Sequence, residues 1–179
     1  MATLKSGREI SVSAVNMSRT LNLGSDIAAR KNVQESASPR DQTGAMALIQ
    51  IEFDIAADSA RVWQVIGDWA DGPVRMAPGF VASCEAEADG RVVAFADGFI
   101  ARERLVSRDE PARRIAYSLT GDGAPAHDNA VMQVLADGPL RCRFIWTRDV
   151  WPDEAAGPLR AAMQEAAPII KRALETATG

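Results

Sequence analysis

The last stretch of the chain, Pro152–Thr178, most constrains what the sequence can fold into. Its apolar residues recur at three- and four-residue steps, which predicts an α-helix of about six turns with one apolar stripe. The stripe consists of Leu159, Ala162, Met163, Ala166, Ile170, Ala173 and Leu174. Because an amphipathic helix at a chain end must bury its stripe, the rest of the chain has to supply an apolar surface.

The preceding segment, 46–151, is predicted to supply that surface as a β-sheet. Residues 47–55 alternate between apolar and polar side chains, which predicts a strand with one solvated face. A short helix capped by Asp58 or Ser59 and a Gly/Pro-rich link over 69–79 follow. Short strands separated by tight turns then predict an antiparallel meander. They are expected at 80–88, 91–96, 99–107, 114–120, 127–135 and 141–150. The predicted fold is therefore α+β, with a seven-stranded antiparallel sheet wrapped around a long C-terminal helix.

The first 45 residues differ from the rest of the chain. They are rich in Ser, Asn, Thr, Gln and Ala and contain no aromatic residue. Such a composition cannot bury enough apolar surface to offset the entropy of ordering. We predict a disordered tail, or an extension mis-called upstream of a natural start at Met46. A transit peptide fits less well because of Glu9, Asp26, Glu35 and Asp41. The single domain is predicted to comprise residues 46–179.

Length and charge restrict the partners of this domain. The 179 residues are enough for one ordinary domain, and the net charge of −4 argues against nucleic-acid binding. No apolar run reaches the roughly 18 residues that a membrane span needs, and no signal-peptide core is visible. The expected setting is the cytoplasm. Monomer and homodimer both stay open.

The two cysteines, Cys84 and Cys142, are far apart and form no CxxC pair. With a single histidine they cannot build an ordinary zinc site. We therefore predict two free thiols, no bound metal and no cofactor.

Several short segments carry a family resemblance. They occur at 60–69, 98–105, 109–119, 132–134, 144–146 and 170–174, and include AlaArgValTrpGlnValIleGlyAspTrp, GlyPheIleAlaArgGluArgLeu and AspGluProAlaArgArgIleAlaTyrSerLeu. In this order and spacing the chain resembles the SRPBCC superfamily of START and birch-pollen-allergen-like proteins, in its polyketide cyclase and lipid-transport-like branch. The resemblance implies the helix-grip fold, in which the inner sheet face and the long helix line a cavity.

Three polar residues are candidates for chemistry in that cavity. Strand alternation places Glu103 on the inward face, where a carboxylate must find water, a cation or a ligand group. A buried ion pair with an arginine such as Arg148 is the structural alternative. Tyr117 is also inward by phase, and His127 opens a strand next to a Gly/Pro loop where related proteins often have a gate. If the protein is an enzyme, Glu103, His127 and Tyr117 are its candidate catalytic residues.

The predicted function is binding of a small hydrophobic or aromatic molecule between sheet and helix. An apolar wall with few polar groups is the usual makeup of a ligand site. The candidate ligand-binding residues are Phe53, Met76, Glu103, Leu105, Tyr117, Leu119, His127, Met132, Phe144, Trp146, Met163 and Ile170. Two alternatives stay open: a polyketide cyclase or dehydratase-like enzyme that uses acid/base residues of the cavity, and a partner-binding module with a vestigial cavity.

Overall fold

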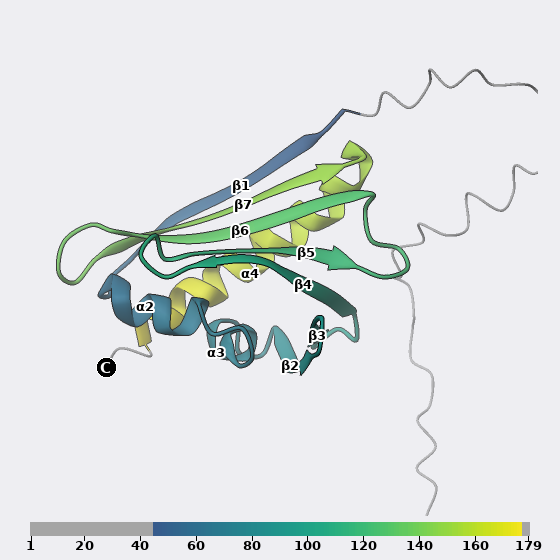
Figure 1. Ribbon diagram of the computed structural model, residues 1–179. Helices are drawn as coiled ribbons and strands as arrows, with labels where there is room; N and C mark the ends of the chain where they lie inside the picture. The colour runs from purple at the N-terminus through teal and green to yellow at the C-terminus, as the bar shows by residue number, and fades with distance from the viewer. Residues whose placement is uncertain (1–44, 177–179) are drawn as a thin grey trace, which may run out of the picture. The chain divides into compact units, whose positions relative to one another are not determined.

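The computed structural model describes residues 45–176, which belong to one unit of the chain (Figure 1). Seven antiparallel strands form one sheet in the order β1-β7-β6-β5-β4-β3-β2. The strands are β1 (Ala47–Ile55), β2 (Val81–Glu87), β3 (Gly90–Phe95), β4 (Ile100–Asp109), β5 (Arg114–Thr120), β6 (His127–Ala136) and β7 (Cys142–Trp151). The predicted α+β class and the seven-stranded antiparallel sheet are confirmed. The predicted tail, residues 1–45, lies outside the described residues except for Ala45.

The long helix α4 (Ala156–Thr176) crosses the concave face of the sheet, after a short 3-10 turn η1 (Asp153–Ala155) (Figure 1). Its predicted stripe is buried at Met163, Ala166, Ile170 and Leu174 and half-buried at Leu159 and Ala173. The prediction was wrong for Ala162, which is exposed because it lies at the edge of the face that α4 turns toward the sheet. The helix runs alongside β1 in the same direction and is tied to it at both ends. Near its start Arg160 donates to the Leu48 carbonyl, and near its end Glu175 accepts from the Ala56 amide at 3.0 Å.

Two short helices cover one end of the sheet. Helix α2 (Ser59–Ile66) begins as predicted with Asp58, whose carboxylate accepts from the Ala60 and Arg61 amides. Helix α3 (Gly72–Met76) lies where a plain link was predicted. Its second residue is Pro73, which helices tolerate in the first turn because that N–H has no intrahelical partner.

The core lies between the sheet and the helices. The inward positions of β6 and β7 alternate as their sequences predict, from Ala130 to Val134 and from Cys142 to Val150. At one end the space is filled: Phe144 is fully buried and lies directly across the strand pair from Phe53, with ring centroids 5.0 Å apart. Both cysteines are free thiols, as predicted.

Candidate functional site

A cavity of about 140 Å³ lies between the sheet and α4, toward the α3 side. Its walls are mainly apolar. Helix α4 contributes Met163 and Ile170, α3 contributes Met76, and the sheet contributes Val93 and Met132. Most of these side chains are buried, so the hollow is part of the interior rather than a surface depression. A mainly apolar wall of this kind favours apolar occupants.

One wall of the cavity contains a buried ion pair between Arg91 and Glu103. The two residues lie directly opposite each other on β3 and β4, and the shortest contact is 2.6 Å. Both arginine nitrogens in the pair bind the same carboxylate oxygen, Oε2. No hydrogen bond to the other oxygen, Oε1, is present among residues 45–176, and Glu103 lines the cavity. Glu103 faces inward as predicted, but its arginine partner is Arg91 and not Arg148.

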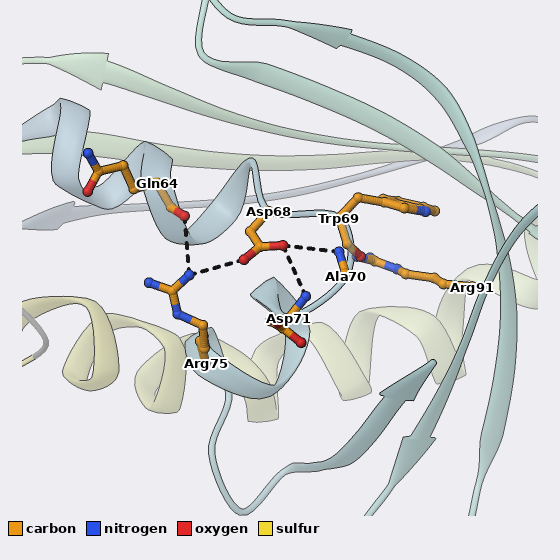
Figure 2. Close-up of polar contacts among 7 residues, drawn as sticks. All are labelled: Gln64, Asp68, Trp69, Ala70, Asp71, Arg75 and Arg91. Carbon is orange, nitrogen blue, oxygen red and sulfur yellow. Dashed lines mark hydrogen bonds and ion pairs between the residues drawn. The ribbon is translucent and has the colours of Figure 1, made fainter. Parts of the chain in front are cut away.

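Arg91 also holds the α2–α3 corner against the sheet. Its guanidinium lies 3.8 Å from the centroid of the Trp69 ring and donates to the Trp69 carbonyl at 3.0 Å (Figure 2). The corner is closed by Asp68, which accepts from the Ala70 and Asp71 amides and from Arg75 (Figure 2). A cation–π contact and a charge-assisted hydrogen bond therefore join the cavity wall to the segment before α3.

A second buried ion pair, Arg148 with Asp128, joins β7 to β6. Two guanidinium nitrogens bind the two carboxylate oxygens at 2.5 and 2.9 Å, in a bidentate arrangement. Asp128 also accepts from the Leu119 amide at 2.7 Å, where the β5–β6 pairing has ended at Tyr117 and Ala130. Burial on its own lowers the pKa of Arg148, but the hydrogen bonds to Asp128 and nearby negative groups offset this and raise it.

Tyr117 and Trp146 complete the polar part of the cavity. Burial, together with the Glu103 carboxylate, raises the pKa of Tyr117, so its hydroxyl stays protonated and can donate. The Trp146 indole N–H approaches this hydroxyl without reaching hydrogen-bond geometry, and its Nε1 is a buried donor with no partner among the described residues. Both side chains line the cavity.

The mouth of the cavity is aromatic. Phe80, Phe95 and Phe99 form a row with ring centroids 5.5 and 5.8 Å apart, and all three line the cavity. Phe99 is 48% exposed, and the exposed Asp97 lies in the same hairpin. The row therefore leads from solvent to the interior.

Of the twelve predicted ligand-binding residues, eight lie around this cavity. They are Met76, Glu103, Tyr117, Leu119, Met132, Trp146, Met163 and Ile170. Their role in binding stays a prediction.

The expectation that Phe53, Leu105, His127 and Phe144 line the cavity is wrong. Phe53 and Phe144 pack on each other at the filled end, and His127 is exposed at the start of β6. Leu105 pairs with Tyr117 and so shares its face, but it is 38% exposed, beyond the cavity. Alternation fixes which face a side chain occupies, and it does not fix where along that face a hollow lies.

Two charged residues of the site were missed from the sequence, although a signal for each was present. Arg91 is in phase with Val93 and Phe95 on β3, and Asp128 is in phase with Ala130 and Met132 on β6. Extending the alternation by one further step of two residues would have placed both on the inward face. The aromatic row at the mouth was not predicted as part of the site, although the strands predicted at 80–88 and 99–107 included Phe80 and Phe99. In the structure these two residues lie just before β2 and β4.

In the part of the chain that the structure describes, no group of three or more His, Cys, Asp or Glu side chains could hold a metal ion. Within the same residues, no helix is long and apolar enough to cross a membrane.

An antiparallel sheet gripping a long C-terminal helix, with a cavity between them, defines the START-like, helix-grip class of proteins. Residues 46–178 match the family described as polyketide cyclase / dehydrase and lipid transport, and the chain belongs to this family, within the SRPBCC superfamily. The predicted helix-grip fold and superfamily are thereby confirmed. None of the curated proteins matches the sequence.

Solved structures share the fold at low sequence identity. An uncharacterized protein from Bacillus thuringiensis is 20% identical, with a TM-score of 0.63 over 72% of this chain and 98% of that one. The ZhuI aromatase/cyclase from Streptomyces sp. R1128 is 18% identical, with a TM-score of 0.61 over 75% and 94%. A START superfamily protein from Mycobacterium smegmatis is 12% identical, with a TM-score of 0.57 over 73% and 96%. Similarity at this level establishes the shared fold and leaves activity to be argued from the site.

Proposed function

We propose that this protein binds a small apolar or aromatic molecule in the cavity between the sheet and α4. The observation that carries the proposal is a hollow of about 140 Å³ with a mainly apolar wall and a few polar side chains. A core without such a role is normally packed to the density of an organic crystal, because a void loses dispersion contacts. The aromatic row of Phe80, Phe95 and Phe99 would give the ligand a route to solvent.

Native mass spectrometry of the protein purified from its source tests this proposal. The expected spectrum contains a species heavier than the chain by one small organic molecule. Ala166→Leu should remove that species, because Ala166 lines the cavity and a larger side chain would fill it. Ala161→Leu is the matched control on the exposed side of the same helix and should retain it. A species that survives Ala166→Leu, or a wild-type chain that carries nothing, would contradict the proposal.

A second candidate function is acid–base catalysis of the polyketide cyclase kind, favoured by the uncommitted Oε1 of Glu103. A general base needs an atom within reach of the proton that it removes. The Glu103 carboxylate would take a proton from a carbon between two carbonyl groups, and the electron pair would move to a carbonyl oxygen. The protonated Tyr117 hydroxyl would stabilise the resulting enolate by hydrogen bonding.

Deuterium exchange distinguishes the enzyme from the binding protein. Benzoylacetone in heavy water should exchange its central C–H faster with protein than with buffer. Tyr117→Phe should slow this exchange without displacing the ligand. If the central C–H exchanges no faster with protein than in buffer, acid–base catalysis is excluded and binding remains the proposed function.

A further inference from the structure

Trp146 presents a buried hydrogen-bond donor that lies near the Tyr117 hydroxyl but completes no hydrogen bond among residues 45–176. It is 8% exposed, lies on β7 and lines the cavity, and its Nε1 has no partner within residues 45–176. Trp63 shows the contrasting case, because its Nε1 donates to Glu110 Oε2 at 2.6 Å. Leaving a buried N–H unpaired is costly, and such groups are rare in native structures. An acceptor atom on a bound molecule would remove that cost.

The buried charged side chains around the cavity are already paired with one another. Arg91 is paired with Glu103, and Arg148 with Asp128, and all four side chains are buried. A charged ligand group would have to leave water without finding an unpaired countercharge in the inner cavity. The exposed Asp97 at the mouth further disfavours an anion. An uncharged polar group fits this environment.

The volume limits how much of a ligand the inner cavity can hold. A cavity of roughly 150 Å³ lined by apolar side chains accommodates one benzene ring. The present cavity, of about 140 Å³, has Met132, Met163 and Ile170 in its walls. It therefore suits a single ring, and a long acyl or polyketone chain would exceed it.

We infer that the cavity takes an uncharged one-ring aromatic molecule carrying a hydrogen-bond acceptor, which receives the Trp146 indole N–H. This inference rests on the proposed binding function and narrows it to a chemical class. The ring occupies the space between Met132 and Met163, and the acceptor, a carbonyl or hydroxyl oxygen, lies at Trp146 Nε1. Tyr117, whose hydroxyl stays protonated, is a second donor for the same oxygen.

Four probes of similar size separate the contributions of ring, acceptor and charge. They are ethylbenzene, acetophenone, benzoate and benzylamine, titrated into the ¹⁵N-labelled full chain. Acetophenone is expected to bind about tenfold more tightly than ethylbenzene, a difference of one net hydrogen bond. Benzoate and benzylamine are expected to bind more weakly than acetophenone. Of the four tryptophan indole resonances, the one absent from Trp146→Phe should shift with acetophenone.

Two variants test whether the N–H itself is responsible. Trp146→Phe should lower the affinity for acetophenone to that for ethylbenzene. Trp63→Phe is the matched control, since its N–H bonds Glu110 away from the cavity, and should keep the tenfold ratio. The indole shift in the wild-type chain decides the question if Trp146→Phe does not fold.

The outcomes distinguish this inference from the proposed function. Equal binding of ethylbenzene and acetophenone, or an unshifted Trp146 indole, would overturn the inference and leave the cavity as an apolar binding site. Tighter binding of benzoate or benzylamine would overturn the uncharged class. Failure of every probe to bind would overturn the proposed function and this inference together.

Discussion

The two ends of the space between sheet and helix are built differently. At one end, Phe53 and Phe144 stack across β1 and β7 and fill the interior. At the other end, alternation along β4 and β7 places Glu103, Trp146 and Arg148 inward around a hollow. The filled end is closely packed, whereas the hollow end contains two buried ion pairs, Arg91 with Glu103 and Arg148 with Asp128. The proposed binding function therefore places stability and binding in separate parts of one core.

The largest expected effect is at the filled end. Phe144→Ala should lower the free energy of unfolding by about 3–5 kcal/mol, because it removes a fully buried ring and leaves a new cavity. Urea denaturation measures this loss. Met163→Ala, in the wall of the hollow, should cost only about 2 kcal/mol, near the low end for such truncations, because Met163 already faces empty space. Equal losses for the two variants would show that the ends do not differ.

The ion pairs at the hollow end can be tested next. Glu103→Gln should lower the free energy of unfolding by about 3 kcal/mol, because it leaves Arg91 buried without its countercharge. Replacing both residues by Met should recover most of that loss, since an apolar pair carries no desolvation penalty. Thermal and urea unfolding of the three proteins provide the comparison. An unchanged free energy of unfolding in Glu103→Gln would show that the Arg91–Glu103 pair does not stabilise the hollow end.

Alkaline pH should lower the free energy of unfolding in two steps, first through Cys142 at the filled end and then through Tyr117 at the hollow end. Burial, with a smaller contribution from Asp58, raises the pKa of Cys142 from its ordinary value of 9.0 to about 11. Between these values the unfolded thiol loses its proton while the folded thiol keeps it, so the free energy of unfolding falls as the pH rises. The raised pKa of Tyr117 adds a further fall above its ordinary value of 10.0. The stabilisation from both groups is complete below pH 9.

Two substitutions show which residue causes each part of this fall in the free energy of unfolding. Cys142→Ala should remove the fall that begins at pH 9, and Tyr117→Phe the fall that begins at pH 10. Cys84→Ala is the control, since Cys84 is only half-buried and should leave most of the profile intact. A profile that stays flat to pH 11 in the wild-type chain would contradict the burial of both groups.

The smallest effect is expected upstream of the domain. A chain that begins at Met46 should melt within a few degrees of the full-length chain, because the composition of residues 1–45 offers little apolar surface to bury. Calorimetry of the two proteins measures the difference. A loss of several kcal/mol, or protection of amides 10–15 from hydrogen exchange, would show that this segment takes part in the fold.

The fold was predictable because its signals are local. Alternation at 47–55 and the stripe of the final helix depend on neighbouring residues, and the structure confirms both except at Ala162, which is exposed. The short helix α3 was missed because Gly72 and Pro73 favour a link unless the chain around them is known. Local patterns therefore determined the strands and the long helix better than the corner between α2 and α3.

The site was predictable only in part because its contacts are distant in sequence. Alternation placed Glu103 and Tyr117 inward, but it could not choose Arg91 over Arg148 as the partner of Glu103. That choice depends on strand order, since β3 and β4 are neighbours and β7 lies three strands away from β4. The contact of Arg91 with Trp69 depends on how the α2–α3 corner folds back, which no local pattern encodes.

The central claim, that the hollow end binds a small ring, is tested most directly through methionine methyl groups. Met76, Met132 and Met163 line the cavity, whereas Met46 is exposed at the start of the domain and serves as an internal reference. With ¹³C-methyl methionine, saturating ethylbenzene should shift the first three resonances and leave that of Met46 in place. Unchanged cavity resonances, or a shift confined to Met46, would contradict the claim.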